Sequence, residues 1–534
     1  MISFADKQEG RLQTEHQLLH QTIGFSAAYL AVQYLFSHIK KTPESITEQT
    51  VTALLMLIQS NRYAAKRQAY FLYKETACAL IHLSFDRTHP LAGFSIFKLQ
   101  ELLLSSHGKK HRAVSEALGS LPLTITGPDI QAINLNDRVD VSFDTLLCQL
   151  EDLDITAFHW HGRTLRGEMP NGHIACIKFA RSKENGADLI MESHWLHFLR
   201  DNPPCRQSTF KIPIPVCINN TALFKLTHLP NVIRENPHIS KEYLAIVFIA
   251  EKDYFFYPNA PDFFKDQRMA VKEIFRRNAW LLGKLTSQGI IHTALIPLFH
   301  NRVQQSRRDD HGVYVWEQGG RLDKWLESSQ FPNFAKSGLR DFEHLIAIKD
   351  TKKLHHFIGE HILGFVLVVG SVFRNKAPER LGWDENGHPI DTRSLFDRSV
   401  FSELFQDIVR LYYQGMTGVP LKTINQFFDD RLIDRLIETM GMDHHMEETL
   451  RIRDQDNMTE TEFHDFLISR GYDTSLPAHI KKGDQDIVLN TGPHLGGFNQ
   501  PISVPELMEF LFCLSSLCIS DRYLMENGLK ASSN

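Results

Sequence analysis

The spacing of apolar residues changes twice along this chain, and that order of patterns limits the folds open to it. Residues 7 to about 120 follow the 3.6-residue period of amphipathic helices, 155–250 contain short β-rich runs, and the chain beyond 345 is helical again. Helices and strands therefore occur in separate blocks. A Rossmann-type sheet needs strands that alternate with helices, so the sequence predicts an α+β fold, with a small, mostly antiparallel sheet between two helical blocks.

The chain is too long for one hydrophobic core, since it has 534 residues. We expect a helical N-terminal domain over 1–150, a β-rich nucleotide-binding region over 151–255 and a mainly helical catalytic region over 256–534. The turn PNG at 170–172 separates two β-rich runs and predicts a β-hairpin.

Composition excludes several classes of function. The net charge is −5 and the pI is near 6.6, so no partner nucleic acid is expected. Seven cysteines without a C-x-x-C pair indicate a reducing compartment, and the N-terminal residues lack the pattern of a signal peptide. The most apolar stretch, 362–373, is too short to span a bilayer. We therefore expect a cytoplasmic protein without a membrane partner.

Residues 289–345 concentrate polar side chains that follow short apolar runs, which are rigid enough to hold them in place. Asn301 and Asp341 can share a divalent ion with nucleotide phosphates, because Mg²⁺ takes a few protein oxygens and completes its shell with phosphate and water. Glu343 adds a third predicted metal ligand. Arg340 is either the ion-pair partner of Asp341 or a clamp for charge that develops in a transition state.

Lys178 lies within a strand of apolar residues, where it either reaches solvent from a sheet edge or enters a site that holds phosphate. Glu192 is either a surface charge or the residue that holds Lys178, as a helix glutamate holds a strand lysine in kinase-like folds. Arg163 and Thr164, on the preceding strand, offer a guanidinium and a hydroxyl to the same phosphate.

Two short segments resemble elements of protein kinases. HTALIP at 292–297 is similar to H-R-D-L-x-P, and RDFE at 340–343 is similar to D-F-G. The position of the kinase catalytic aspartate holds Ala294, so an ordinary protein kinase is not expected.

The chain as a whole resembles the siderophore synthetases that work without peptide-synthetase modules, of the aerobactin-synthetase type. Their nucleotide motifs are Ser-x-Arg-Thr, a strand lysine, a Gly-Ile segment that ends in Gln-Asn, and Arg-Asp-x-x-Gly. The matching residues here are Arg163, Thr164, Lys178, Gly289, Ile290, Asn301, Arg340 and Asp341, with His161, His300 and His344 in place of the serine, the glutamine and the last glycine.

This resemblance implies a thumb, fingers and palm architecture that uses ATP and Mg²⁺. The implied reaction activates a small-molecule carboxylate as an acyl-adenylate, which an amine or alcohol then attacks. Arg340 and His300 would be catalytic, and Arg302 and Arg307 would receive an acidic substrate. The implied nucleotide-binding residues are Arg163, Thr164, Lys178, Glu192 and Asn301. The resemblance leaves open whether the protein forms a homodimer.

Two alternatives remain at this point. The first is a kinase-like phosphotransferase or pseudokinase, with a kinase-like cradle that uses Lys178, Glu192, Asn301 and Asp341. The second is a non-enzymatic helical interaction protein whose polar centre only satisfies buried groups.

Overall fold

The structure is a computed structural model, and its described residues cover most of the helices and the sheet. They are 24–85, 89–130, 138–150, 158–161, 163–182, 186–205, 210–219, 221–251, 254, 268–293, 306–308, 314–316, 334–335, 338–374, 398–421, 432–433, 436, 488–489, 502–503 and 505–529.

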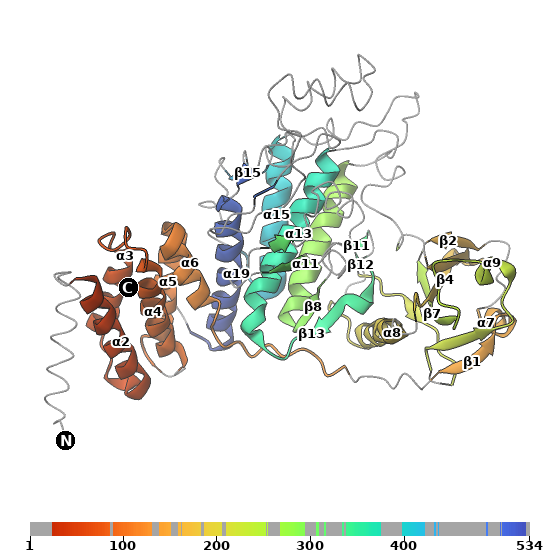
Figure 1. Cartoon of the computed structure of the whole chain (residues 1–534), viewed down its shortest axis with the longest axis horizontal. Helices are drawn as coiled ribbons and strands as arrows, with labels where there is room; N and C mark the ends of the chain where they lie inside the picture. The colour runs from red at the N-terminus through yellow and green to blue at the C-terminus, as the bar shows by residue number, and fades with distance from the viewer. Residues whose placement is uncertain are drawn as a thin grey trace, which may run out of the picture.

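The N-terminal part is a bundle of helices that stands at one end of the molecule (Figure 1). Its members are α2 (Phe25–Lys41), α3 (Glu48–Gln59), α4 (Ala69–His82), α5 (Ala92–Ser105) and α6 (Gly108–Leu118). The hydroxyl of Thr47 accepts a hydrogen bond from the backbone N–H of Thr50 and caps the start of α3. The predicted N-terminal helical block is confirmed.

Seven described strands form one sheet at the opposite end of the molecule (Figure 1). They are β1 (Val139–Ser142), β2 (His159–His161), β3 (Thr164–Glu168), β4 (His173–Phe179), β5 (Ile214–Pro215), β6 (Phe224–Thr227) and β7 (Leu244–Glu251). The order is β1-β6-β7-β4-β3-β2, with β5 paired to β7, and every pair except β1–β6 is antiparallel. The predicted α+β class and the predicted hairpin, β3–β4, are both confirmed. Strand β1 belongs to this sheet although it precedes the expected domain boundary at residue 150.

Each face of the sheet packs against a different apolar core. Ala175 and Ile177 of β4 belong to the outer core, which includes the short helix α7 (Phe143–Gln149). Cys176 belongs to the main core, which continues through α8 (Gly186–Asp201) into the C-terminal helices. Because successive strand residues face opposite sides, Lys178 points to the same side as Cys176, toward α8.

The C-terminal part contains four long described helices, α11 (Arg268–Ser287), α13 (Leu354–Arg374), α15 (Arg398–Thr417) and α19 (Pro505–Glu526). Helices α11 and α15 approach so closely that a Cβ at Gly283 or Gly415 would collide with the backbone of the other helix. Glycine at these crossing points therefore permits the close contact. None of the described helices combines the length and the apolar character that a bilayer span requires.

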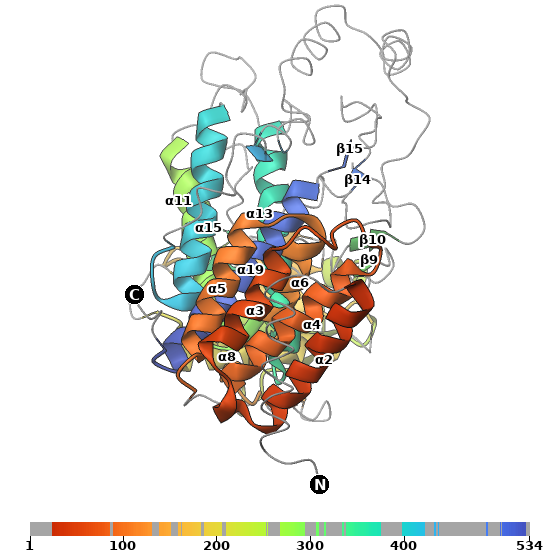
Figure 2. The ribbon, with the colours of Figure 1, turned by 90° about the vertical axis from the view of Figure 1, so that its left-hand side faces the viewer.

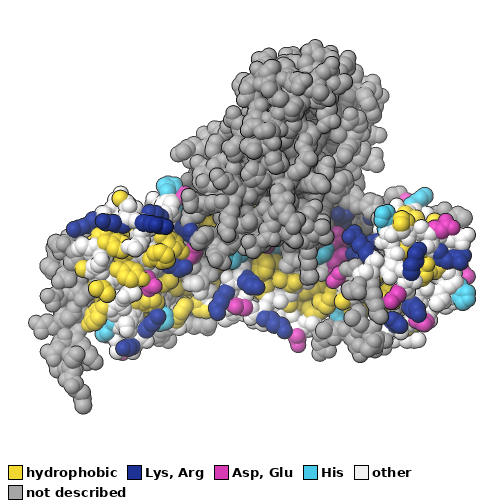
Figure 3. All heavy atoms as spheres, viewed as in Figure 1, with side chains coloured by type: hydrophobic (Ala, Val, Ile, Leu, Met, Phe, Trp, Pro, Cys, Tyr) yellow, Lys and Arg dark blue, Asp and Glu magenta, His cyan; other side chains and the backbone are white. Residues whose placement is uncertain are grey.

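Two views show how the parts join. Helix α19 packs against α5 and α6, so the N-terminal bundle stands directly against the C-terminal helices (Figure 2). Gln100 donates hydrogen bonds to Ser520 and Asp521 across this contact. Over the face in Figure 3, described side chains of both charge signs are interspersed.

The remaining described elements are short. They are α9 (Asn231–Arg234), β8 (Ile290–His292), β9 (Ser306–Arg308), β10 (Tyr314–Trp316), β11 (Phe334–Ala335), β12 (Gly338–Leu339), β13 (Leu345–Ala347), β14 (Val488–Leu489), β15 (Ile502–Ser503) and four 3-10 turns, η1 (Pro43–Ser45), η2 (Leu83–Phe85), η7 (Phe342–His344) and η8 (Thr351–Lys353). Strands β8 and β13 pair antiparallel and bring both ends of the 289–345 stretch together. This pairing places the segment after β12 beside the sheet and α8.

Candidate functional site

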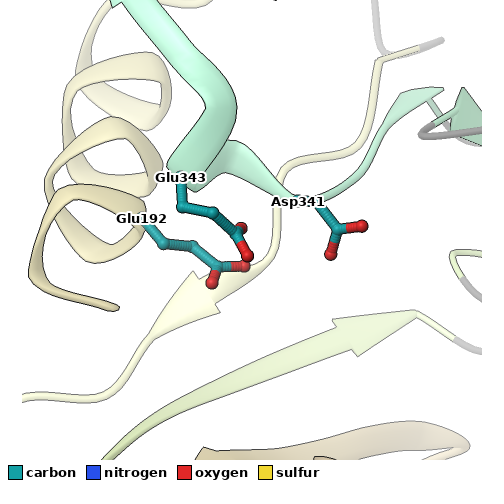
Figure 4. A group of neighbouring side chains, drawn as sticks. All are labelled: Glu192, Asp341 and Glu343. Atoms are coloured by element: carbon teal, nitrogen blue, oxygen red, sulfur yellow. The ribbon is translucent and has the colours of Figure 1, made fainter. Parts of the chain in front are cut away.

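Three carboxylates from two separate parts of the chain surround the ammonium group of Lys178. Its Nζ lies 2.7 Å from Glu192 Oε2 and 3.2 Å from Asp341 Oδ1. It also lies 2.9 and 3.0 Å from the two carboxylate oxygens of Glu343. Figure 4 shows the Glu192 and Glu343 side chains next to each other, extending from α8 and from the segment at 341–343 toward the side where Asp341 lies. The structure thus brings together four residues that the sequence analysis selected.

Strand β4 and helix α8 hold the buried half of this cluster. Lys178 points from the main-core face of β4 and is only 5% exposed. Glu192 lies on the same side of α8 as Leu189 and Leu196, one turn from each, and is 1% exposed. An ammonium and a carboxylate buried to this degree are tolerated only as a pair. Glu192 is therefore not the surface charge that we had kept as an alternative.

Asp341 occupies a turn between β12 and η7. Its backbone is in the left-handed region, with φ 51° and ψ 61°, where aspartate is one of the few non-glycine residues found with any frequency. This turn sends Phe342 into the core, where it is fully buried, and leaves the Asp341 side chain 38% exposed. Asp341 is the acidic group of the cluster that a ligand from outside can reach.

Glu343 connects Lys178 to a second cation. Its Oε1 accepts a hydrogen bond from Nη2 of Arg163 at 2.8 Å, and its side chain is 4% exposed. Thr164, next to Arg163, is the direct register partner of Lys178 on the neighbouring strand. The guanidinium and hydroxyl predicted for a phosphate site therefore lie on the strand next to Lys178.

The local charges fix the protonation of the cluster. Burial acts to lower the pKa of Lys178, but the surrounding carboxylates, that of Glu192 foremost, raise it. Burial acts to raise the pKa of Asp341, but Lys178 and Arg340 lower it well below its usual range. The pKa of Glu343 is also lowered, against burial, chiefly by Lys178, whereas burial and then Glu343 raise the pKa of Glu192. Asp341 and Glu343 are therefore ionised at neutral pH, as ligands of a hard cation must be.

A chain of buried hydrogen bonds positions the segment that carries Asp341. The ring of His292 donates from Nε2 to the backbone carbonyl of Arg340 at 2.9 Å. The ring of His361, on α13, donates from Nε2 to the carbonyl of His292 at 3.0 Å, and its Nδ1 accepts from the hydroxyl of Tyr412 at 2.9 Å. His292 was not predicted as a site residue, although it stands where kinases have the histidine of the H-R-D element.

Tyr254 is a second residue that the sequence analysis missed. It is 3% exposed and lies just beyond β7. Burial, followed by the nearby charges of Glu192 and Asp341, raises the pKa of its phenol. Tyr254 therefore adds a neutral polar group beside the carboxylates, and no sequence pattern marks it.

Of the remaining predicted site residues, only Arg340 has a described side chain. Arg340 is 9% exposed and contributes its charge to Asp341 beside it. His300, Asn301 and Arg302 lie outside the described residues. Arg307 lies in β9, where the backbone is described and the side chain is not. The roles proposed for these last four residues stay predictions.

The donor set suits a magnesium–phosphate ligand. Carboxylate oxygens of Glu192, Asp341 and Glu343 lie within 4.8 Å of one another, and oxygen is the ligand atom that Mg²⁺ prefers. Lys178 and Arg163 beside them supply the donors that phosphate accepts. The arrangement can hold a polyphosphate and its metal at one point between β4, α8 and the segment at 341–343.

Comparison with known proteins adds one distant similarity. No protein-family model matches the chain. The chain is similar to the calmodulin-dependent glutamylase SidJ of Legionella pneumophila, with 22% identity over 202 residues, which is 34% of this chain. The chain spans 22% of the length of that relative.

Proposed function

We propose that the site binds ATP with Mg²⁺ and that the chain is an ATP-dependent ligase that activates a carboxylate. The observation that carries this proposal is the Lys178 ammonium, paired with Glu192 at 2.7 Å and facing Asp341 at 3.2 Å. A buried, oriented lysine beside a partly exposed aspartate provides one group for phosphate and one for the metal.

The positions of the site residues indicate which of them would bind phosphate and which would bind the metal. Glu192 holds Lys178 from the buried side, so the ammonium group is oriented before a ligand arrives. Asp341, the most exposed carboxylate of the cluster, would hold Mg²⁺, which neutralises phosphate charge when it is bound. Arg163 would stabilise charge that develops on phosphate oxygens.

Two observations support carboxylate activation. The name of the relative, a glutamylase, denotes an enzyme that attaches glutamate, which is a ligation. The motifs around Arg163, Lys178 and Asp341 resemble those of the siderophore synthetases, which suggests a small-molecule carboxylate as the other substrate class. In the acyl-adenylate route, a carboxylate oxygen bonds to the α-phosphorus as pyrophosphate leaves. An amine or alcohol then takes the acyl group as AMP leaves.

A kinase-like phosphotransferase is the second candidate. It is supported by the pair of strand lysine and helix glutamate, and by the buried Phe342 that follows Asp341. Ala294 at the position of the kinase base weakens this candidate, because a base there accepts the proton of the substrate hydroxyl.

Product analysis separates the candidates. The purified chain is incubated with Mg-ATP and with glutamate or citrate, with and without calmodulin, and release of pyrophosphate is measured against release of ADP. Pyrophosphate and AMP are expected from a ligase, and ADP from a phosphotransferase. Lys178→Met should abolish either signal, whereas Lys225→Met, on β6 of the same sheet, should not. A wild-type chain that shows no product and no thermal shift with Mg-ATP would favour a non-enzymatic interaction protein.

A further inference from the structure

The two cations of the candidate site, Lys178 and Arg163, share one carboxylate. Glu343 accepts from Arg163 at 2.8 Å and contacts Lys178 through both of its oxygens, at 2.9 and 3.0 Å. A phosphate group that bound here would contact the same nitrogen atoms. Glu343 therefore fills the position that the proposed function assigns to phosphate.

Glu343 is not required to keep Lys178 in place. Glu192 already pairs with the ammonium at 2.7 Å from the side of α8, and Asp341 contacts it at 3.2 Å. Arg163, at 15% exposure, has Glu343 as its acidic partner within the described part of the chain. Glu343 thus occupies the side of Lys178 and Arg163 that a ligand would approach, and its negative charge balances theirs there.

We propose that Glu343 is an internal competitor of phosphate, and that Mg²⁺ relieves this competition by offering the Glu343 carboxylate a cation beside Asp341. The inference rests on the proposed function. Its geometric basis is that oxygens of Glu343 and Asp341 belong to a group in which all lie within 4.8 Å of one another. The exchange would move the Glu343 carboxylate from Arg163 and Lys178 toward a cation held beside Asp341.

The exchange makes binding of metal and nucleotide mutually dependent. Without Mg²⁺, nucleotide phosphates are repelled by the negative charge of Glu343. If they displace Glu343 from Lys178 and Arg163, its carboxylate has no other cation to bind. Without nucleotide, Mg²⁺ meets the positive charge of Lys178. Each ligand removes the obstacle to the other, which is a positive coupling between two sites. Glu343→Gln removes the competing charge and keeps the shape of the side chain, so it should reduce the coupling.

The test is a calorimetric titration of the full chain with ATP, once in EDTA and once in excess Mg²⁺. We expect metal-free ATP to bind E343Q at least tenfold more tightly than the wild type. The factor by which Mg²⁺ improves ATP affinity should fall at least tenfold in the same variant. Glu251→Gln is the matched control, because it makes the same charge change at an exposed ion pair with Lys211 on the same sheet. Its ATP affinities should equal those of the wild type.

Two results would overturn the inference in different ways. If the wild type binds Mg-ATP but E343Q binds metal-free ATP no more tightly, Glu343 does not compete with phosphate, and the proposed function stands. If neither protein binds ATP with or without Mg²⁺, the proposed function itself fails. Should E343Q not fold, Glu343→Asp replaces it, since the shorter side chain cannot span both cations. Metal-free ATP should then bind at least threefold more tightly, and an unchanged or weaker affinity would refute the competition.

Discussion

The Lys178 ammonium lies 2.7 Å from the Glu192 carboxylate, and this pair joins strand β4 to helix α8 inside the protein. Both side chains are at least 94% buried. In such surroundings, removal of one partner leaves the other as an uncompensated charge, which costs more than the pair itself contributes. The pair therefore links the stability of the sheet region to the geometry of the candidate site.

Lys178→Met should destabilise the chain by about 3–5 kcal/mol, because the buried carboxylates around Lys178, that of Glu343 above all, lose the cation they share. Adding Glu192→Leu should recover part of this loss, since Asp341 and Glu343 still lack the ammonium, and it should not restore ATP binding. The measurement is urea denaturation of the wild type, both single variants and the double variant, which together give the interaction energy. Full additivity of the two changes would contradict the pairing.

Asp341→Asn should abolish ATP-dependent turnover and lower stability only modestly, by about 1–2 kcal/mol. The Asp341 side chain is 38% exposed, and Lys178 retains the carboxylates of Glu192 and Glu343 after the change, so the buried ammonium keeps its counter-charges. The amide oxygen is a weaker ligand for Mg²⁺ than the carboxylate. Melting curves with and without Mg-ATP test both parts. A variant with a much lower Tm that still binds Mg-ATP normally would exclude Asp341 as the metal ligand.

His292→Ala should lower turnover indirectly, by changing the position of Asp341, since His292 bonds to the backbone of Arg340. The change removes the donor to the Arg340 carbonyl and costs about 1–3 kcal/mol. Because the Asp341 turn is then less well fixed, kcat should fall at least tenfold and more Mg²⁺ should be needed for half-maximal activity. His159→Ala, at an exposed position of β2, is the control. Loss of stability with an unchanged Mg²⁺ requirement would show a purely structural role.

Acid should destabilise the protein through two buried histidines. Burial lowers the pKa of His111 to about 4 and that of His361 to about 4, from 6.5. The folded state therefore binds fewer protons than the unfolded state over this interval. The stability from each neutral histidine is fully present above pH 6.5 and is lost as the pH falls toward 4, by about 3 kcal/mol per histidine.

The readout for this prediction is the change of Tm between pH 7 and pH 4.5 in the wild type and in His111→Gln. Glutamine does not titrate, so the variant should lose less stability on acidification than the wild type, whatever its Tm at pH 7. An equal acid sensitivity in both proteins would show that His111 is not neutral and buried in the folded state.

The sequence alone determined the local elements, because they depend on spacing within a few residues. The periodicity of apolar side chains predicted the helices and strands, and the turn at 170–172 predicted the β3–β4 hairpin. A lysine within an apolar strand and a glutamate on the next helix were enough to suggest the pair of Lys178 and Glu192. These two residues are close in sequence, so few chain arrangements could separate them.

Tertiary structure decided everything that depends on distant segments. Strand β1 pairs in parallel with β6, far along the chain, so no local pattern placed it in the sheet. Glu343 was predicted as a metal ligand from its neighbourhood to Asp341, yet its contacts with Arg163 and Lys178 arise only because β8 pairs with β13 and brings that segment to the sheet. Local periodicity shows which face of an element is buried. The packing of the whole chain decides which segment covers that face. It therefore also decides which charged groups lie next to each site residue.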